Sequence, residues 1–412
     1  MINKVLPTSY FQSNRQALGN MLADGSLAVI AAGRAPVRTA DAHYRFLANR
    51  SFFYLTGIEQ EGSILLLLRE YGVTRSILFL PSTDPIHERW NGKRVTRTEA
   101  MTRAGLTDVS YIEGFEGQLA DLLATRVTRL WLDFSAEDAQ AQYMRKRLAD
   151  ENPQLETSDL SPLLIQLRMI KKQEELDLIR ESAKLTGEGI MAILRACRPG
   201  CKEYHLWSEF QYTLSQAGCL EPAFDSIIAS GANSLCLHYM NPMATIQDGD
   251  LIQLDVGATI GGLCADISRA LPANGKFTPR QRQIYDLVRR CEDMAFATIR
   301  PGIRLAQIND ACQAVAREGL TRLGLLQPEQ PVKEYFWHNV SHHLGLDVHD
   351  VSNKEALLKP GMVLTVEPGI YIPEWGFGMR LEDDVVVTED GCHLLSTGIP
   401  READEIEALM GG

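Results

Sequence analysis

The chain has 412 residues, of which 45% are hydrophobic and 23% are charged. These figures are ordinary for folded globular proteins and argue against a disordered or fibrous chain, and the length suffices for two domains with separate cores. The formal net charge of -12 argues against a nucleic-acid partner, because phosphate backbones are bound by clustered lysine and arginine side chains. The densest basic run, 145–147, is interpreted as a solvated helix face.

Neither the N-terminus nor any apolar run indicates a membrane partner. Residues 1–20 are mixed and polar, without the apolar core of a signal peptide, and the longest aliphatic run, 64–68, is too short to span a bilayer. We therefore expect a cytoplasmic protein. The eight cysteines include no CxxC pair and lie mostly in apolar stretches, which predicts reduced thiols, no disulfides and no zinc-finger site.

Residues 1–165 alternate between strand-like and helix-like segments, which predicts an α/β domain. Helices are expected over 98–104 and 135–148. Strands are expected over 26–31, 63–68, 76–80 and 130–132. Turn-forming residues at 152–153 and 161–162 then precede a long helical pattern, so the domain boundary is placed between residues 165 and 166.

Residues 166–412 contain an internal repeat. An Arg-Pro-Gly triplet follows one helical stretch at 198–200 and another at 300–302. Residues 249–257 match 361–369 in register, and each segment has an acidic residue six positions after one glycine and two before the next. The pattern predicts two copies of a unit of helices followed by a hairpin, paired around a pseudo-twofold axis. A site at their junction would draw acids from both copies.

Four acidic residues stand in or beside runs that should be apolar. Asp255 and Glu367 occupy the matched positions of the two copies, and Asp266 and Glu382 belong to the returning strands. A buried carboxylate is costly unless it is paired or bound to metal, and four together repel one another, so two divalent cations would compensate them. The alternative, an ion pair with a strand arginine for each acid, is disfavoured by the duplicated register.

Histidines are concentrated in the same domain. One imidazole can complete a shell of oxygen ligands suited to Mn²⁺, Co²⁺, Fe²⁺ or Zn²⁺, while others polarise a carbonyl group or transfer protons. An isolated histidine usually has a structural role, so only the clustered ones are candidates for these functions. Five of the nine histidines form this cluster: His238, His338, His342, His343 and His349.

These motifs resemble those of the pita-bread metallopeptidases, and in particular the aminopeptidase P (Xaa-Pro aminopeptidase) branch. In the N-terminal half, residues 38–46 and 52–57 resemble the creatinase-type α/β domain of that branch. The resemblance covers nearly the whole chain and implies a creatinase-like domain over 1–165 and a pita-bread catalytic domain over 166–412. In the second half it rests on the segments 230–239, 342–350, 366–371 and 380–383.

The resemblance implies a site with two divalent metal ions, most readily Mn²⁺, that activates water for attack on the bond before a proline. Glu367 would also relay protons, and His238 and His349 would assist catalysis and bind substrate. The metal ligands that it implies are Asp255, Asp266, His342, Glu367 and Glu382.

The implied substrates are peptides with proline at the second position. Trp90 would either reach the site of a neighbouring subunit in a homodimer or homotetramer, or have a structural role. Two positions depart from the family pattern, because Leu263 and Asn339 stand where a tyrosine and a glycine are common, and neither position is a ligand. The implied substrate pocket consists of His238, His338, Val348, His349, Tyr371 and Arg380.

Three alternatives remain open from the sequence. The first is a prolidase, which performs the same chemistry but only on Xaa-Pro dipeptides, and the N-terminal motifs disfavour it. The second is an enzyme of the same fold that is not a peptidase, such as an amidinohydrolase or a lyase, and the third is a non-catalytic peptide-binding protein. The complete set of metal ligands disfavours both.

Overall fold

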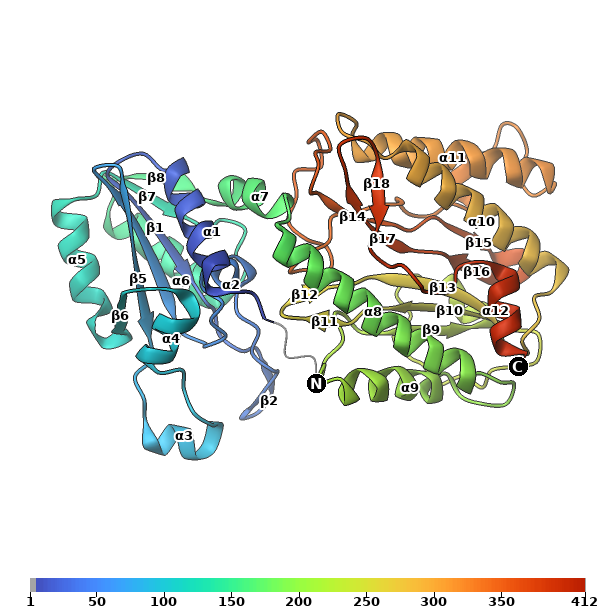
Figure 1. The fold of residues 1–412 in the computed structure, drawn as a ribbon, viewed down its shortest axis with the longest axis horizontal. Coiled ribbons are helices and arrows are strands. Elements are labelled where there is room, and N and C mark those ends of the chain that lie inside the picture. Colours follow the sequence, from blue (N-terminus) through green and yellow to red (C-terminus); the bar gives the residue numbers. More distant parts are fainter. Residues whose placement is uncertain (1–4, 412) are drawn as a thin grey trace. The chain divides into compact units, whose positions relative to one another are not determined.

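The computed structural model describes residues 5–411, which form two compact units (Figure 1). The first unit is Leu6–Arg168, and the second begins at Met169. Both mix helices and strands, as expected for an α/β chain. All eight cysteines are free thiols. In the described part of the chain no helix has the length and apolar character that a membrane span requires.

The first unit is built on a six-stranded mixed sheet with the strand order β6-β5-β4-β1-β7-β8. The central strands β1 and β4 are antiparallel, whereas β1 and β7 are parallel. Its strands are β1 (Ser26–Ala31), β4 (Ile64–Glu70), β5 (Val73–Leu80), β6 (Asp108–Tyr111), β7 (Arg129–Leu132) and β8 (Glu156–Asp159), with a separate pair β2 (Val37–Thr39) and β3 (Ala42–His43). Its helices are α1 (Thr8–Met21), α2 (Arg50–Thr56), α3 (Pro85–Asn91), α4 (Arg97–Ala104), α5 (Phe115–Thr125), α6 (Ala139–Glu151) and α7 (Ser161–Met169), the last of which crosses the unit boundary.

Burial on both faces explains why the central strands are continuous apolar runs. Alternate residues such as Leu66 and Phe79 pack with α5 and α6 in one core cluster. The opposite side of β4 and β5 contacts α1. A sheet that is covered on both faces loses the alternation of apolar and polar residues, so such strands are visible in the sequence as short hydrophobic runs.

The four predicted strands of the first unit are confirmed, and four others were missed: the pair β2 and β3, and the sheet strands β6 and β8. Strands β6 and β8 are short and largely polar, and they join the sheet by parallel pairing with β5 and β7, which leaves no signal in the local sequence. The predicted start of a helix at residue 135 is wrong. The helix begins at Ala139 because the Asp138 side chain caps it, accepting a hydrogen bond of 2.9 Å from the backbone N–H of Ala141.

The second unit repeats one order of elements, with two helices followed by strands. In each half, two long strands are connected through a small hairpin. The first half contains α8 (Gln173–Ala196), α9 (Glu203–Gln216), β9 (Ile227–Ser230), β10 (Leu251–Val256), β11 (Thr259–Ile260), β12 (Leu263–Cys264) and β13 (Ile267–Pro272). The second half contains α10 (Pro279–Thr298), α11 (Leu305–Arg322), β14 (Val363–Val366), β15 (Gly369–Ile372), β16 (Phe377–Arg380), β17 (Asp383–Val387), β18 (Cys392–Leu394) and the closing helix α12 (Ala403–Met410).

The two halves pair their strands in the same way. Strand β10 is antiparallel to both β13 and β9, and β14 is antiparallel to β17. Residues 340–344 lie beside β14 as β9 lies beside β10. The backbone N–H of Thr365 donates to the carbonyl of His342 at 3.0 Å, and that of Glu367 donates to the carbonyl of Val340 at 2.9 Å. The segment with His342 is therefore part of the second sheet.

Helix α8 holds the hairpin that separates Asp255 from Asp266. The Ser182 hydroxyl donates to the carbonyl of Leu263 at 2.8 Å and accepts from the backbone N–H of Ile260 at 3.0 Å. One turn further along α8, the hydroxyl of Thr186 accepts from the backbone N–H of Ala258 at 2.9 Å. These buried bonds fix the distance between the two acids.

A glycine allows the close approach of the strands at this hairpin. A Cβ atom added to Gly257 would lie 2.0 Å from the carbonyl oxygen of Ala265 and 2.8 Å from a ring carbon of Phe224. Backbone atoms cannot rotate away, so we predict that Gly257→Ala destabilises the protein by about 1–3 kcal/mol and weakens metal binding by moving Asp266. Thermal unfolding and a Mn²⁺ titration measure the two effects.

Gly391→Ala is the matched control, because its added Cβ would meet nothing closer than 3.9 Å. Equal melting temperatures and equal Mn²⁺ affinities for the two variants would contradict the proposed close approach.

Candidate metal centre and active-site cavity

A cavity of about 530 Å³ opens in the second unit. Both halves of the duplicated unit contribute to its wall. Two of the residues expected in the substrate pocket lie elsewhere: Tyr371 is buried behind the wall, and Val348 does not line this cavity. Trp90, on α3 of the first unit, is 82% exposed. The expected site residues on the cavity wall are His238, Asp255, Asp266, His338, His342, His349, Glu367, Arg380 and Glu382.

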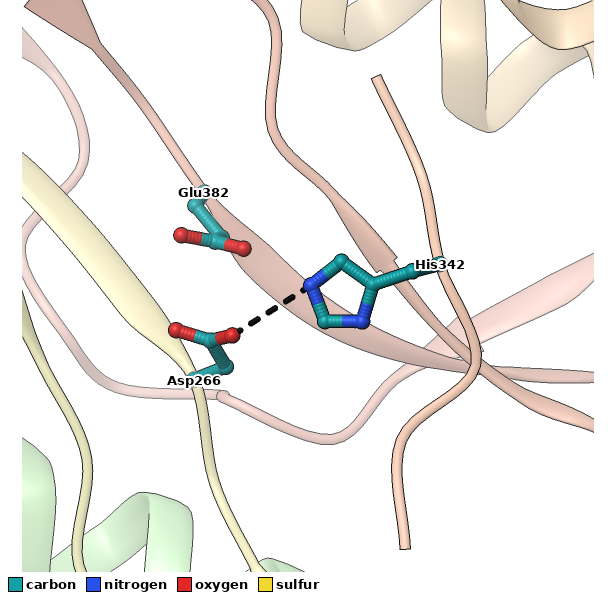
Figure 2. A group of neighbouring side chains, drawn as sticks. All are labelled: Asp266, His342 and Glu382. Carbon is teal, nitrogen blue, oxygen red and sulfur yellow. Dashed lines mark ion pairs between the residues drawn. The ribbon is translucent and has the colours of Figure 1, made fainter. Parts of the chain in front are cut away.

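Asp266, His342 and Glu382 form the core of the candidate metal centre (Figure 2). One ligand atom from each lies within 4.8 Å of the others, and Nε2 of His342 is 3.4 Å from Oδ2 of Asp266. Asp266 directly precedes β13 and Glu382 lies between β16 and β17, so the two acids come from different halves of the repeat. Two carboxylates and an imidazole are a typical donor set for Mn²⁺, Fe²⁺, Co²⁺ or Zn²⁺.

The imidazole of His342 is oriented as a metal ligand. Its Nδ1 lies 3.1 Å from the carbonyl oxygen of His343, so Nδ1 carries the proton. The lone pair is then on Nε2, which points toward Asp266. A hydrogen bond from the second ring nitrogen to a backbone carbonyl is the usual way in which proteins fix a metal-binding histidine.

The two other predicted ligands border this group. Oε1 of Glu367 lies 3.6 Å from Nε2 of His342. Oδ2 of Asp255 accepts a hydrogen bond of 2.6 Å from Arg380, whereas its buried Oδ1 has no hydrogen-bond partner. A buried carboxylate oxygen without a donor is costly, and a cation would satisfy it. This unsatisfied atom fits a metal ion between Asp255 and the other acids.

Asp266, Glu367 and Glu382 hold their protons more tightly than free carboxyl groups do. Burial raises the pKa of Asp266 and of Glu382, and the negative charges of neighbouring acids raise both further. Burial also raises the pKa of Glu367, to about 7. The protein thus concentrates more negative charge than it neutralises, and a divalent metal supplies the missing positive charge.

A chain of hydrogen bonds links Arg380 to His338. Arg380 donates to the hydroxyl oxygen of Tyr371 at 2.8 Å, and this hydroxyl lies 2.8 Å from Nε2 of His338. Nδ1 of His338 lies 2.8 Å from the carbonyl of Asn339 and carries the ring proton. Burial and the charge of Arg380 lower the pKa of His338 to about 4, so this imidazole is neutral at pH 7. Tyr371 therefore acts on the site through Arg380 and His338.

His238 and His349 present exposed imidazoles on the cavity wall. The ring centre of His349 lies 4.2 Å from that of the candidate ligand His342. The protein atoms around His349 partly desolvate its ring and so lower its pKa, and the neighbouring histidines lower it further. A neutral imidazole with one N–H can donate to a carbonyl oxygen and can accept a proton.

The alternative to a metal site was an ion pair between each of the four acids and a strand arginine. The arginines of the structure do not form these four pairs. Arg380 pairs with Asp255 alone, at 2.6 Å. Arg269 pairs with Asp383 at 2.9 Å and donates to the backbone carbonyl of Glu382 at 2.7 Å, so it supports the ligand strand and leaves the ligand carboxylates free.

Sequence reasoning missed Ser268. Its hydroxyl donates to Glu382 at 2.8 Å and accepts from Arg380 at 3.0 Å. Ser268 is two residues after Asp266, so it points to the same face of the sheet, and this spacing was the available signal.

A buried ion pair between Lys171 and Asp350 was also missed. Nζ of Lys171 lies 2.6 Å from Oδ2 of Asp350, and both side chains are 1% exposed. The backbone N–H of Asp350 donates to the carbonyl of His343 at 2.9 Å. The pair thus supports the loop between the candidate ligand His342 and His349. The partners are 179 positions apart, which no local pattern reveals.

The chain belongs to the metallopeptidase family M24. The profile described as "Metallopeptidase family M24" matches residues 177–389, which contain all five expected ligands. A second profile, "Aminopeptidase P, N-terminal domain", matches residues 11–131. Together they confirm the fold class, an N-terminal domain of the aminopeptidase P type followed by an M24 catalytic domain.

Individual relatives agree over the full length. The chain is similar to the Xaa-Pro aminopeptidase of Escherichia coli strain K12, with 33% identity over 427 residues that cover 97% of each chain. It is similar to a solved Bacillus anthracis structure assigned as an aminopeptidase P, with a TM-score of 0.95, 38% identity, and 98% and 99% of the two chains covered. The zinc-substituted E. coli aminopeptidase P in complex with product superposes with a TM-score of 0.92 at 31% identity, over 99% of each chain.

Metal binding should release protons. Because the pKa of Glu367 lies near 7 in the metal-free protein, above its ordinary 4.5, a bound metal displaces protons from the cluster. We predict that Mn²⁺ affinity falls as the pH is lowered below 7, by about tenfold per pH unit for each proton displaced. Calorimetric titration in two buffers with different ionisation enthalpies measures the affinity and the proton release.

Stability provides a second measurement of the same effect. The raised pKa means that the metal-free fold binds more protons than the unfolded chain, so its stability falls as the pH rises from 4.5 through 7. Added Mn²⁺ should therefore raise the melting temperature more at about pH 8 than at about pH 6. Equal affinities at both pH values would contradict the proton displacement.

We predict that removing the charged amine of Lys171 causes a large loss of stability. Lys171→Met leaves Asp350 buried without this cation, which should cost about 3–5 kcal/mol of unfolding free energy. Urea denaturation measures it. Lys184→Met, at an exposed position on α8, is the control and should change stability by less than about 0.5 kcal/mol. A similar small change in both variants would show that the buried pair is not needed.

Proposed function

We propose that the protein is a dinuclear-metal aminopeptidase that releases the N-terminal residue from peptides with proline at the second position. One observation carries the proposal: the Asp266, His342 and Glu382 group lies on the wall of a cavity with room for the end of a peptide. The full-length similarity to an Xaa-Pro aminopeptidase supports the substrate class.

The metal site would hold two divalent cations, with Mn²⁺ as the preferred ion and Co²⁺, Zn²⁺ or Fe²⁺ as possible substitutes. Cations at such a site activate water and polarise a peptide carbonyl. Asp266 and Glu382 would hold both ions, and each half of the repeat supplies one of these two acids. Asp255 would complete the ligand shell of one ion, and His342 and Glu367 would complete the ligand shell of the other.

The side chains around the metals would handle protons and orient the substrate. Glu367, whose pKa is raised to about 7, would take a proton from the attacking water and return it to the leaving nitrogen. His349 and His238 would donate to the carbonyl oxygen of the first residue, where negative charge develops. The free amine of the substrate would bind beside Asp255.

Proline makes the scissile bond a tertiary amide without an N–H, so the site must recognise the ring by shape. The candidates for that contact are the cavity-lining residues His238, His338 and His349. Neutral His338 is held by Tyr371, which Arg380 orients in turn. This chain of hydrogen bonds would hold His338 as a rigid wall for the proline ring of the substrate.

The oligomer and the cellular location remain predictions from the sequence. We propose a homodimer or homotetramer in the cytoplasm, in which Trp90 either serves a neighbouring subunit's site or is structural. Its exposure of 82% is compatible with both roles.

A peptide panel tests the proposed function. With added Mn²⁺, the protein should release Xaa from Xaa-Pro-Xaa peptides, and it should leave matched Xaa-Ala-Xaa peptides largely uncut. Asp266→Ala and Glu382→Ala should each lower kcat/KM by about 100-fold or more, since loss of an outer-shell partner alone costs 10–100-fold. Release of the first residue is followed by chromatography.

Two results would overturn the proposed function. Hydrolysis of Xaa-Pro dipeptides alone would assign the protein as a prolidase. Undiminished cleavage after exhaustive chelation would show that no metal takes part.

A further inference from the structure

Glu203 is a buried acid that lies outside the metal cluster. It is the first residue of α9, and it is fully buried, with 0% exposure. Its carboxylate accepts five hydrogen bonds, all from uncharged donors. The donors are the backbone N–H and hydroxyl of Ser230 at 2.7 Å each, the amide of Asn233 at 3.0 Å, the hydroxyl of Tyr239 at 3.1 Å and the backbone N–H of Ala244 at 3.0 Å.

All five donors belong to one segment, 230–244. Ser230 ends β9, and Ala244 lies where the segment returns to α9. The backbone N–H of Glu203 also donates to the carbonyl of Ala244 at 3.1 Å. One carboxylate therefore ties both ends of the segment, and Tyr239 near its middle, to the first turn of α9.

This segment carries His238, which lines the cavity. Within the described part of the chain the imidazole of His238 makes no hydrogen bond, so its position depends on the backbone that carries it. Tyr239, the next residue, is fixed by its hydrogen bond to Glu203. On the other side of the segment, the hydroxyl of Ser234 accepts from the backbone N–H of Gly378, on the strand that ends at Arg380.

We propose that Glu203 is a positioning residue for the active site: it holds the segment 230–244 so that His238 faces the substrate. The inference rests on the proposed function, because that function assigns His238 to substrate binding and catalysis. It goes beyond the metal ligands and the substrate pocket, since Glu203 touches neither.

Glu203→Gln is the sharpest substitution. The three donors from Ser230 and Asn233 surround one carboxylate oxygen, which the amide oxygen of glutamine can replace. The other oxygen would become an NH₂ group that faces the backbone N–H of Ala244, and two donors repel. The substitution therefore frees the half of the segment next to His238 and keeps the other half in place.

A double-mutant cycle provides the test. We expect Glu203→Gln to lower kcat/KM for an Xaa-Pro-Xaa peptide by about 10-fold, but by less than about 2-fold when His238→Ala is already present. Equal reductions in both backgrounds would show that Glu203 acts on stability alone and would overturn the proposal. Glu209→Gln, at an exposed position on the same helix, is the matched control and should change neither value.

Hydrogen exchange gives a readout that does not depend on activity. Backbone amides of 230–244 should exchange faster in Glu203→Gln than in the wild type, while those of β10 and β13 stay protected. If the glutamine variant does not fold, Tyr239→Phe removes a single donor and should show the same local change at smaller amplitude. Unchanged exchange in 230–244 would overturn the proposal. This result is independent of the proposed function, because the exchange measurement does not require the wild type to cleave an Xaa-Pro peptide.

Discussion

The structure depends on the confinement of four carboxylates in one place. Asp255, Asp266, Glu367 and Glu382 line a single cavity, and burial together with the charges of neighbouring acids raises the pKa of Asp266, Glu367 and Glu382. Arg380 neutralises one of them by its contact with Asp255. A protein stores such repulsion only where another ligand relieves it, and a divalent cation does so most effectively. The surrounding architecture keeps these side chains together when they would otherwise move apart.

Duplication is how the chain achieves this confinement. Each half contributes one acid at a long strand and one at the returning strand, and the small hairpin between them sets their separation. Helix α8 fixes the first hairpin through Ser182 and Thr186. In the second half, residues 340–344 pair with β14, so that His342 enters the cluster from a backbone position that the sheet determines. The metal centre is thus assembled from backbone pairing, which is more rigid than a set of loops.

The other acids near the site show why the cluster is distinctive. Asp383 pairs with Arg269, Asp350 with Lys171, and Glu203 with five uncharged donors. Each of these carboxylates has partners supplied by the protein, and each supports a segment that carries a site residue. Asp255 pairs with Arg380 and retains a buried Oδ1 with no donor, and Asp383 likewise retains a buried Oδ2 beside its pair with Arg269. The four candidate metal ligands differ from these acids in that they line one cavity together, whereas Asp383, Asp350 and Glu203 are not among the residues that line it.

The sequence by itself determined the fold class, the repeat and the residues of the cluster, because these leave local signals: apolar runs for the central strands, and matched spacing of glycines and acids for the two hairpins. Only the tertiary structure decided which acid pairs with Arg380, that Ser268 joins Glu382, that Tyr371 acts from behind the wall, and that β6 and β8 are strands. It also decided the role of Glu203 and the pairing of Lys171 with Asp350, which lie 179 positions apart. Such pairings follow from strand register and helix packing between distant segments, and no local pattern in the chain specifies them.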